Sequence, residues 1–592
     1  MWAARCKSED RIAWQAEATG LRDDVASHLA MFSRRQAIVG LGGLALVTGL
    51  SGCAMPVTPV CANDPRLTDP STPLTIDTHV HVFNGSDLQV ARFIDLVIQN
   101  QLDQETRAAL GDILQKIAWS LAPSGDEELF ELQRIRAALQ ACEGTQINQV
   151  VEGAQEEAYQ RARRALGEAI ERGPPSFRSR ARLSVERRIQ ALPPTAREYR
   201  SQRRQRRSLR GRDMNVQGVL DFVIQNFQFR YVNTYDYLNT YSRGRSRKVD
   251  LIVSHLVDFD WPIAGGERTA TPLTDQIRVM EEIAVLTGGR IHSFAPFDPF
   301  RDIAARRVPT RLVPFDLARD AVENRGFLGI KLYPAMGFAP FGNADLQIAH
   351  PNFWNQPWLS DEFREDPQLG RALDESLGTL YTWCRQNDVP IMAHTARSNG
   401  PSAAFETLSD PKYWRKALAA FPGLRVSFGH FGDPMKTPSR AAKFAGLMTP
   451  RPGTRGEFAF ADSGYFSEAL SRPEELRIAL TELYRVTANK GNAALAQRLM
   501  YGSDWEMMLI EGPNVDQYLA RFESIFAELD GDPTLGAAGR LSDQFFGRNA
   551  VTLFGLRQNE QARTRLERFY ARRGVPVPIW MRKVDGVTAL AR

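Results

Sequence analysis

The sequence has few residues of the kinds that build disulfide frameworks or cysteine-based metal sites. Only 5 cysteines occur among 592 residues, and their odd number and wide spread argue against a disulfide framework, while no Cys-x-x-Cys pair suggests a structural zinc site. Histidine is also scarce, with 8 residues. The uncharged apolar run from Ala37 to Leu50 is shorter than the ~20 residues that a transmembrane helix needs. The net charge of +5 decides little, because 74 basic residues nearly balance 69 acidic ones.

Several of the few histidines lie at the ends of short apolar runs. The segment Ile76-Asp77-Thr78-His79-Val80-His81 carries two of them two residues apart. Residues i and i+2 of a strand point to the same side, so both imidazoles can converge on one metal ion. Two further runs end in His394 and His430, and the run Met500-Tyr501-Gly502-Ser503 ends in Asp504.

Strand-like runs alternate with helix-like stretches along most of the chain, which predicts βα units and a parallel sheet. Eight such units suit an α/β fold, a distorted (β/α)8 barrel, whose active site gathers at the carboxyl ends of the strands. The candidate strands lie near 74–79, 249–255, 290–297, 326–333, 389–394, 424–430, 457–462 and 498–503.

The motifs at these strand ends resemble those of the amidohydrolase superfamily. The nearest resemblance is to its amidohydrolase-related branch, which also contains aminocarboxymuconate-semialdehyde decarboxylase. It covers about residues 74–86 and 215–557. The motifs are Asp-Thr-His-Val-His at 77–81, Gly-Ile-Lys-Leu-Tyr-Pro at 329–334, Ala-His-Thr at 393–395, Phe-Gly-His-Phe-Gly at 428–432, Tyr-Gly-Ser-Asp-Trp-Glu at 501–506 and Asn-Ala-Val-Thr-Leu-Phe-Gly-Leu at 549–556.

The resemblance implies a divalent metal site with an open position for water. The mixed set of donors suits Zn²⁺, with Mn²⁺ as the other option. Asp504 would also move the proton of the water, and His430 would orient or polarise the substrate. Lys331 is expected either to contact the substrate or, if carboxylated, to bridge a second metal. The expected ligands are His79, His81, His394 and Asp504.

The reaction class implied is attack of metal-activated water on the carbonyl of a small amide, ester or lactone. Two alternatives remain open: a non-oxidative decarboxylase of the same superfamily, and a non-catalytic binding lipoprotein of the cell envelope. Asp77 is expected to have a structural hydrogen-bonding role. His255 and His292 are expected to pack or to line a pocket, and His350 to be exposed.

The N-terminal region predicts export to the bacterial cell envelope. Arg34-Arg35 before the apolar run resembles a twin-arginine signal, and Leu50-Ser51-Gly52-Cys53 resembles a lipobox, so residues 31–53 would be the signal and Cys53 the lipidated residue. The mature protein would be periplasmic and lipid-anchored. Met31 is then the expected start, with residues 1–30 a misassigned leader and 54–73 a linker.

Three further segments lie outside the barrel pattern. We expect strand 1 at 74–86, a helical insertion at 87–214 that covers the barrel mouth as a lid, the rest of the barrel at 215–557 and a basic surface extension at 558–592. The loop of about 335–370 carries five aromatic residues that could line a substrate pocket or pack on the barrel. An Arg-rich stretch ends the insertion. It could bind anionic lipid headgroups or be a solvated connector. Nucleic acid is not expected as a partner, and the sequence leaves the oligomeric state open. The residues concerned are Phe338, Phe341, Phe353, Trp354 and Trp358 of the loop, and Arg197, Arg200, Arg203, Arg204, Arg206, Arg207, Arg210 and Arg212 of the insertion.

Overall fold

Eight short parallel strands form a single sheet in the computed structural model of the chain, in the order of the sequence from β1 to β8. All described residues belong to one compact unit, Val57–Arg592. The structure describes residues 69–589 apart from 83, 90–91, 94–104, 106–121, 141–143, 172–179, 206–211, 267–268, 309–312, 398–399, 449–457, 489–494, 512 and 536–539. The strands are β1 (Ile76–Val80), β2 (Leu251–His255), β3 (Ile291–Pro296), β4 (Gly329–Leu332), β5 (Ile391–His394), β6 (Val426–Gly429), β7 (Ala459–Asp462) and β8 (Leu499–Met500).

The sheet closes on itself through backbone bonds between β1 and the segment that follows β8. Thr78 N donates to Tyr501 O at 3.0 Å, and a parallel bridge joins Val80 to Trp505. This closure confirms the predicted (β/α)8 barrel, and all eight predicted strands are present. β8 is shorter than predicted because the chain leaves the pleated strand geometry after Met500.

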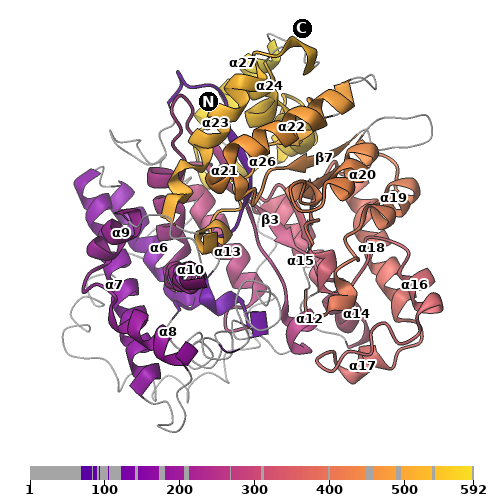
Figure 1. Cartoon of the computed structure of the whole chain (residues 1–592), viewed down its shortest axis with the longest axis horizontal. Coiled ribbons are helices and arrows are strands. Elements are labelled where there is room, and N and C mark those ends of the chain that lie inside the picture. Colours follow the sequence, from indigo (N-terminus) through magenta and orange to yellow (C-terminus); the bar gives the residue numbers. More distant parts are fainter. Residues whose placement is uncertain are drawn as a thin grey trace, which may run out of the picture. The chain divides into compact units, whose positions relative to one another are not determined.

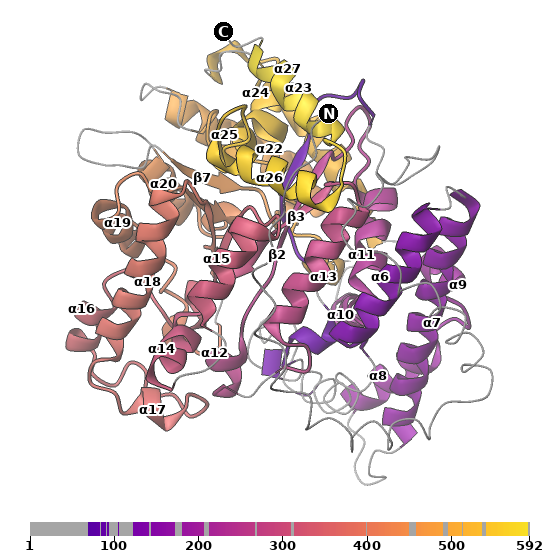
Figure 2. The ribbon, with the colours of Figure 1, turned by 180° about the vertical axis from the view of Figure 1, so that it is seen from behind.

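Helices separate the strands and surround the barrel (Figures 1 and 2). Short apolar strands followed by amphipathic helices give this arrangement, since each helix buries one side against the sheet. From β2 to β8 the helices are α12 (Asp260–Ala264), α13 (Leu273–Leu286), α14 (Pro299–Arg307), α15 (Pro314–Asn324), η4 (Pro334–Met336), α16 (Asn343–Ala349), α17 (Asp361–Arg364), α18 (Leu369–Gln386), η5 (Ala403–Phe405), α19 (Pro411–Ala420), η6 (His430–Gly432), α20 (Pro438–Met448), α21 (Glu468–Ser471) and α22 (Pro473–Ala488). After β8 they are η7 (Met507–Glu511), η8 (Pro513–Gln517), α23 (Tyr518–Leu529), η9 (Pro533–Leu535), α24 (Leu541–Asp543), η10 (Gln544–Arg548), α25 (Asn549–Phe554), α26 (Gln561–Arg573) and α27 (Ile579–Ala589).

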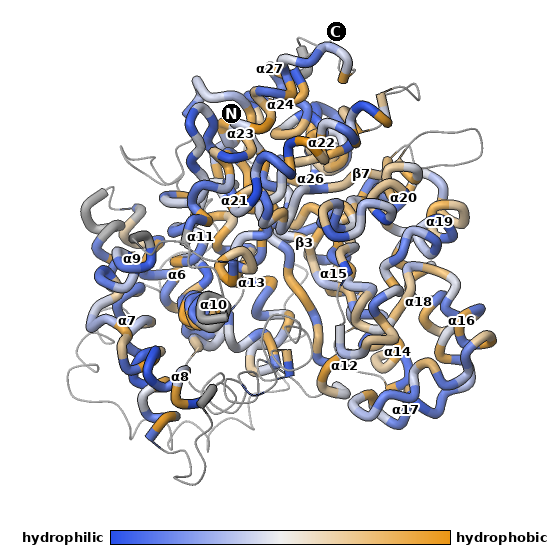
Figure 3. Tube along the Cα trace, in the orientation of Figure 1, coloured by the Kyte–Doolittle hydropathy of each residue, from blue (hydrophilic) through white to orange (hydrophobic). Residues whose placement is uncertain are grey.

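A helical insertion separates β1 from β2, as the polar, helix-like sequence predicts. It continues past residue 214, because α10 crosses this boundary and helical structure ends only at Tyr241. In the colouring of Figure 3, α9 and α17 are mostly hydrophilic. The described helices of the insertion are η2 (Gly85–Asp87), α6 (Gly125–Gln140), α7 (Gly144–Glu171), α8 (Arg180–Gln190), α9 (Ala196–Gln205), α10 (Arg212–Asn226), α11 (Arg230–Asp236) and the π-helical η3 (Tyr237–Tyr241).

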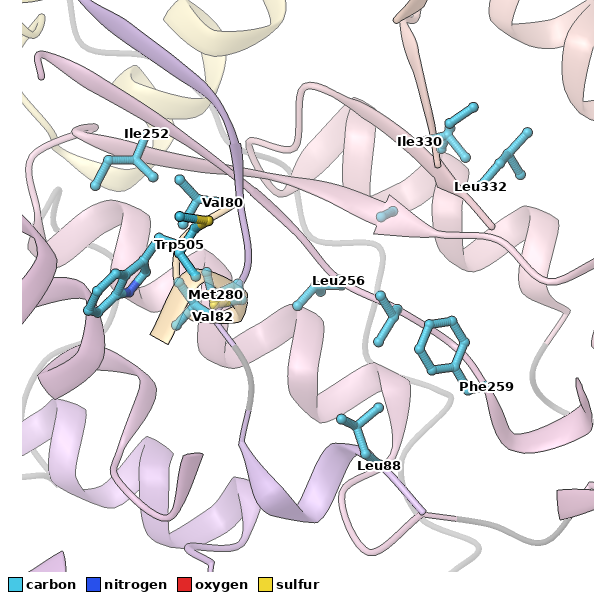
Figure 4. Packing of buried hydrophobic residues seen from close by; sticks show 14 of the residues in the cluster. Val80, Val82, Leu88, Ile252, Leu256, Phe259, Met280, Ile330, Leu332 and Trp505 are labelled. Carbon is cyan, nitrogen blue, oxygen red and sulfur yellow. The ribbon is translucent and has the colours of Figure 1, made fainter. Parts of the chain in front are cut away.

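One large hydrophobic core joins the insertion to the barrel. Figure 4 shows Trp505 beside Val80 and Met280, and Leu256 and Phe259 continuing along the chain after β2. Trp505 is only 1% exposed. The packing therefore fixes the segment directly after Asp504 against β1.

The C-terminal extension was predicted to be a surface segment, and this prediction is wrong. Helices α26 and α27 contribute Phe569, Trp580 and Met581 to a second buried cluster that also contains Ile76 of β1 and Phe294 of β3. Trp580 Nε1 donates to Gly289 O at 2.8 Å. The many arginines of α26 made the segment look exposed in the sequence. They occupy only part of the helix surface, and the remaining apolar stripe packs toward the barrel.

The aromatic residues of the loop after β4 belong to the main hydrophobic core or pack against it. Phe338 and Trp354 are buried, and Trp354 Nε1 donates to Gly337 O at 2.6 Å. Phe353 lies against the ring of Phe405, with ring centres 5.5 Å apart. Among the described helices, none combines the length and the apolar character needed to cross a membrane.

Candidate metal centre

Three side chains converge at the carboxyl end of the barrel strands. His79 and His81 come from β1 and its end, and Asp504 follows β8. One ligand atom of each lies within 4.8 Å of the others. Asp504 Oδ1 is 3.6 Å from His79 Nε2 and 3.4 Å from His81 Nε2. All three side chains are buried.

The backbone around Asp504 has an unusual conformation that directs its side chain toward β1. Asp504 has a φ of 54°, in the left-handed region, which costs a non-glycine residue about 1–2 kcal/mol. The conformation is fixed by the closure of the barrel: Asp504 N donates to His79 O at 2.6 Å, and His81 N donates to Trp505 O at 3.0 Å. The strand and the carboxylate are therefore joined directly by their backbones.

Each histidine of the pair is held through its Nδ1 atom. His79 Nδ1 lies 2.9 Å from Asp462 Oδ1, and His81 Nδ1 lies 2.9 Å from the carbonyl oxygen of His255. Both partners accept hydrogen bonds, so we assign the proton of each neutral ring to Nδ1. The Nε2 atoms then carry lone pairs toward Asp504, which is the arrangement that metal-binding histidines have when an acceptor holds their other nitrogen.

Asp462, at the end of β7, is a site residue that sequence reasoning did not identify. It is fully buried and, besides His79, accepts from His430 N at 3.1 Å and from Gly464 N at 2.9 Å. The sequence did contain an indication of this role: Asp462 directly follows the apolar run 458–461, just as Asp504 follows the apolar run at residues 500–503. One carboxylate thus holds the side chain of His79 on β1 and the backbone that follows β6 and β7.

His394 and His430 form a second pair beside the three converging groups. His430 Nδ1 lies 2.9 Å from Gly464 O, so this nitrogen donates and its Nε2 accepts from His394 Nδ1, also at 2.9 Å. By this assignment His394 Nε2 carries a lone pair, and this buried atom has no hydrogen-bond partner in the part of the chain that the structure describes. The ring of His394 stacks on Tyr333 with centres 4.4 Å apart. His394 is not one of the three mutually close groups, so its role as a ligand, like that of the others, stays a prediction.

Lys331 lies inside the site from β4. Its Nζ is 3.3 Å from His79 Nε2. Burial lowers the pKa of Lys331 to about 8, and burial raises the pKa of Asp504 to about 8. The charge of each partner opposes these shifts, because the ammonium and the carboxylate stabilise one another. Neither the bridging nor the substrate-binding role of Lys331 is tested by this geometry.

Burial keeps the histidines of the site neutral. It is the largest cause that lowers the pKa of His79 and His81 well below the usual value, and the charge of Lys331 adds to it. Burial likewise lowers the pKa of His394 well below its usual value and that of His430 to about 4. Neutral imidazole is the form that binds a metal ion.

The remaining histidines and Asp77 occupy the predicted kinds of place. His255 is buried, with its Nε2 2.9 Å from Thr78 O, and its ring contacts those of both His79 and His81. His292 is buried against Gly326 and Tyr570, and His350 is exposed. Asp77 accepts from Ser503 N at 3.0 Å and from His79 N at 3.2 Å. Its hydrogen-bonding role is confirmed.

The donor set fits a divalent metal ion. Two imidazole nitrogens and a carboxylate oxygen are ligands that Zn²⁺ and Mn²⁺ accept. Among the described residues Asp504 Oδ1 has no hydrogen-bond partner, and for a buried charged group this costs about 1–3 kcal/mol or more unless something binds it. His79, His81 and Asp504 would hold the ion, and His394 Nε2 is a further donor nearby.

The insertion contacts this site through its last helices. Tyr237 donates a hydrogen bond to Asp77. The ring of Tyr241 packs on Trp505 with centres 3.8 Å apart. Helix α10 lies against η7, where a Cβ added at Gly218 would be 2.2 Å from Ile510 O. The insertion therefore packs against both segments that carry site residues, namely β1 and the segment that follows Asp504.

Comparison with known protein families supports the superfamily that the motifs resemble. Residues 310–556 match the model of a family described as amidohydrolase. This range contains Lys331, His394, His430 and Asp504, whereas His79 and His81 lie before it. No curated protein matches the sequence.

Solved structures that resemble the chain include three barrel proteins of low identity. An uncharacterized TIM-barrel protein from Bordetella bronchiseptica shares 12% identity, with a TM-score of 0.34, over 59% of this chain and 91% of its own. A probable 2-pyrone-4,6-dicarboxylic acid hydrolase from Acinetobacter baumannii shares 14%, with a TM-score of 0.29, over 52% and 84%. The 5-carboxyvanillate decarboxylase of Sphingomonas paucimobilis shares 12%, with a TM-score of 0.27, over 52% and 79%.

Proposed function

We propose that the chain is a metal-dependent hydrolase of the amidohydrolase superfamily that cleaves a small amide, ester or lactone. The observation that carries the proposal is the convergence of His79 Nε2, His81 Nε2 and Asp504 Oδ1 at the carboxyl end of the barrel. The match to the amidohydrolase family supports the same class. A bound divalent ion, with zinc as the first choice, would supply Lewis acidity and make water more acidic at neutral pH.

The side chains of the site would divide the remaining work. The Asp504 carboxylate accepts the proton of the attacking water and returns it to the leaving group. His430 is fixed through its Nδ1 by Gly464 O and through its backbone N by Asp462, and its Nε2 accepts from His394 Nδ1, so it would orient the substrate through His394 rather than by a hydrogen bond of its own. Lys331 is within the site and adds positive charge where an oxyanion develops.

The Asp504→Asn variant tests this division of roles. After zinc loading, we expect it to lose about 10²–10⁴-fold in kcat/KM on any lactone, ester or amide that the wild type cleaves. Asp345→Asn is the matched control, since Asp345 is exposed and pairs with Lys416. An Asp504→Asn enzyme with wild-type kcat/KM would contradict the proposal.

Decarboxylation is the second candidate, and Arg440 is the observation that favours it. Arg440 Nη2 donates to Ser409 Oγ at 2.7 Å, and Nε lies 3.0 Å from Asp410 Oδ1. Its buried Nη1 has no hydrogen-bond partner among the described residues. Burial is the largest cause of the lowered pKa of His394, followed by the charges of nearby site residues. The charge of Arg440 is a further, smaller cause, so this guanidinium lies within electrostatic range of the site. If the wild type releases CO₂ from a carboxylic acid and Arg440→Gln does not, the chain is a decarboxylase and the hydrolase proposal is wrong.

We also propose that the protein is exported and anchored to the membrane through a lipid on Cys53. The support is the twin-arginine and lipobox pattern of residues 31–53, which lie outside the described residues, as do Arg206, Arg207 and Arg210. We expect Cys53→Ala to move the protein from the membrane fraction to the soluble fraction, whereas Cys61→Ala should leave it on the membrane. An unchanged distribution of Cys53→Ala would contradict lipidation and return attention to the Arg-rich stretch as a lipid contact.

A further inference from the structure

Tyr333 directly follows β4, in a motif of which the proposed function uses only Lys331. Residues i and i+2 of an extended chain point to the same side, so the side chain of Tyr333 follows that of Lys331 toward the carboxyl end of the barrel. The contacts agree with this placement, because Lys331 Nζ lies 5.2 Å from the centre of the Tyr333 ring. Lys331 is buried and Tyr333 is partly exposed. Tyr333 therefore lies at the barrel mouth, beside the candidate metal centre.

The ring of Tyr333 is held by contacts with three side chains. It stacks on the ring of His394, with centres 4.4 Å apart and an angle of 14° between the planes. It meets the ring of Phe259 in a T-shaped arrangement with centres 5.1 Å apart, and Lys331 Nζ lies over it. Stacked and T-shaped pairs are both favourable geometries for aromatic rings. The packing therefore sets the direction of the Tyr333 hydroxyl before any substrate binds.

The hydroxyl of Tyr333 has no hydrogen-bond partner among the described residues, although its ring is packed on several sides. Because the residue is partly exposed, the hydroxyl can be reached from the barrel mouth. Burial raises the pKa of Tyr333, and the charge of Asp504 adds to this effect, so the hydroxyl keeps its proton at neutral pH. A protonated hydroxyl that is held in place in this way can donate a hydrogen bond to a bound molecule.

We propose that Tyr333 is a catalytic residue whose hydroxyl donates a hydrogen bond to the carbonyl oxygen of the substrate. This bond strengthens as the oxygen gains negative charge during the attack of water. Lys331, on the same side of the chain, supplies positive charge to the same oxygen, and Tyr333 supplies a directional donor. The inference rests on the proposed hydrolase function and adds a residue to it. Because the donor acts mainly in the transition state, its loss should lower kcat more than it raises KM.

The Tyr333→Phe variant tests this role, because it keeps the ring and its packing and removes only the hydroxyl. On p-nitrophenyl acetate, after zinc loading, we expect kcat to fall about 10–100-fold while KM stays within about twofold of the wild type. Tyr484→Phe is the matched control. Tyr484 is buried against Phe526 of α23, and its hydroxyl likewise has no hydrogen-bond partner in the described part of the chain. A wild-type kcat in Tyr333→Phe, or a raised KM with unchanged kcat, would overturn the proposal.

Calorimetric titration with acetohydroxamate, a small acyl mimic that chelates zinc, gives a second readout that needs no turnover. Its oxyanion stands for the carbonyl oxygen, so zinc-loaded Tyr333→Phe should bind it about 10–100-fold more weakly than the wild type. The zinc Kd of the variant, measured with a chelating dye, should be unchanged. A weaker zinc Kd would show that Tyr333 acts through His394 and would overturn a direct contact with the substrate.

The same two measurements separate this inference from the function on which it rests. Equal acetohydroxamate affinity in the wild type and in Tyr333→Phe would contradict the role of Tyr333 alone. A zinc-loaded wild type that neither cleaves p-nitrophenyl acetate nor binds acetohydroxamate would contradict the proposed hydrolase function, and the role of Tyr333 would fall with it.

Discussion

His79 is the residue on which most contacts of the site converge. Asp462 holds its Nδ1, Asp504 and Lys331 lie near its Nε2, and its backbone joins β1 to the segment after β8. Positions of this kind tolerate little change, since a shift of the ring alters several contacts at once. Asp504 has a left-handed backbone conformation, which is unfavourable for a non-glycine residue. Such a conformation persists only where the surrounding fold holds it in place.

Asp462→Asn should weaken metal binding about 10–100-fold, because an amide can present its NH₂ instead of an acceptor to His79 Nδ1 and favour the wrong tautomer. The measurement is the zinc Kd by competition with a chelating dye, which does not depend on knowing the substrate. Asp345→Asn, exposed and remote from His79, should keep the wild-type Kd. Equal zinc affinity in Asp462→Asn would show that this carboxylate does not position the ligand.

His292 should make folding sensitive to acid. Burial lowers its folded pKa from 6.5 to about 4, so the folded protein binds fewer protons than the unfolded chain between these values. The stability that neutral His292 contributes is complete above pH 6.5 and is lost as the pH falls toward 4, by about 3 kcal/mol. Denaturant unfolding at several pH values should show a loss of stability between pH 6.5 and 4 in all three proteins, smaller by about 3 kcal/mol in His292→Gln than in the wild type and in exposed His350→Gln, because the other buried histidines keep their share. Parallel profiles for all three proteins would contradict this account.

At the scale of elements, the strands could be predicted and the arrangement of the added helices could not. Each strand is a short apolar run followed by polar residues, a local pattern that leaves a clear signal. The packing of α26 under the barrel depends on which side of an arginine-rich helix meets a distant surface, and no local pattern records that. Asp462 was missed for a related reason: a single carboxylate after a strand gains meaning only when the barrel brings His79 to it.

The contact of α10 with η7 should be sensitive to a single methyl group. A Cβ at Gly218 would meet the Ile510 carbonyl at 2.2 Å, so Gly218→Ala should lower the free energy of unfolding by about 2 kcal/mol. Gly153→Ala in α7 is the matched control, because no atom of the described residues lies within 4 Å of its added Cβ, and it should gain about 0.5–1 kcal/mol. Urea unfolding measures both. Equal effects of the two substitutions would mean that α10 does not press on η7.

At the scale of the whole molecule, the barrel and the insertion form one structure around the candidate site. The insertion supplies Tyr237 to Asp77 and Tyr241 to Trp505, so it braces the two segments that carry His79 and Asp504. The sequence predicted a lid over the barrel mouth. The contacts described above stabilise the two segments from the side of the insertion. Closure of the insertion over a substrate stays a prediction.

Elemental analysis tests the central claim most directly. Wild-type protein and His79→Ala/His81→Ala are purified side by side, supplemented with zinc and manganese, dialysed and shown to be folded by circular dichroism. We predict about one metal ion per wild-type chain and none retained by the variant, since two of the three converging ligands are gone. Wild-type protein that is folded, supplemented and still free of metal would contradict the metal centre and the hydrolase built on it.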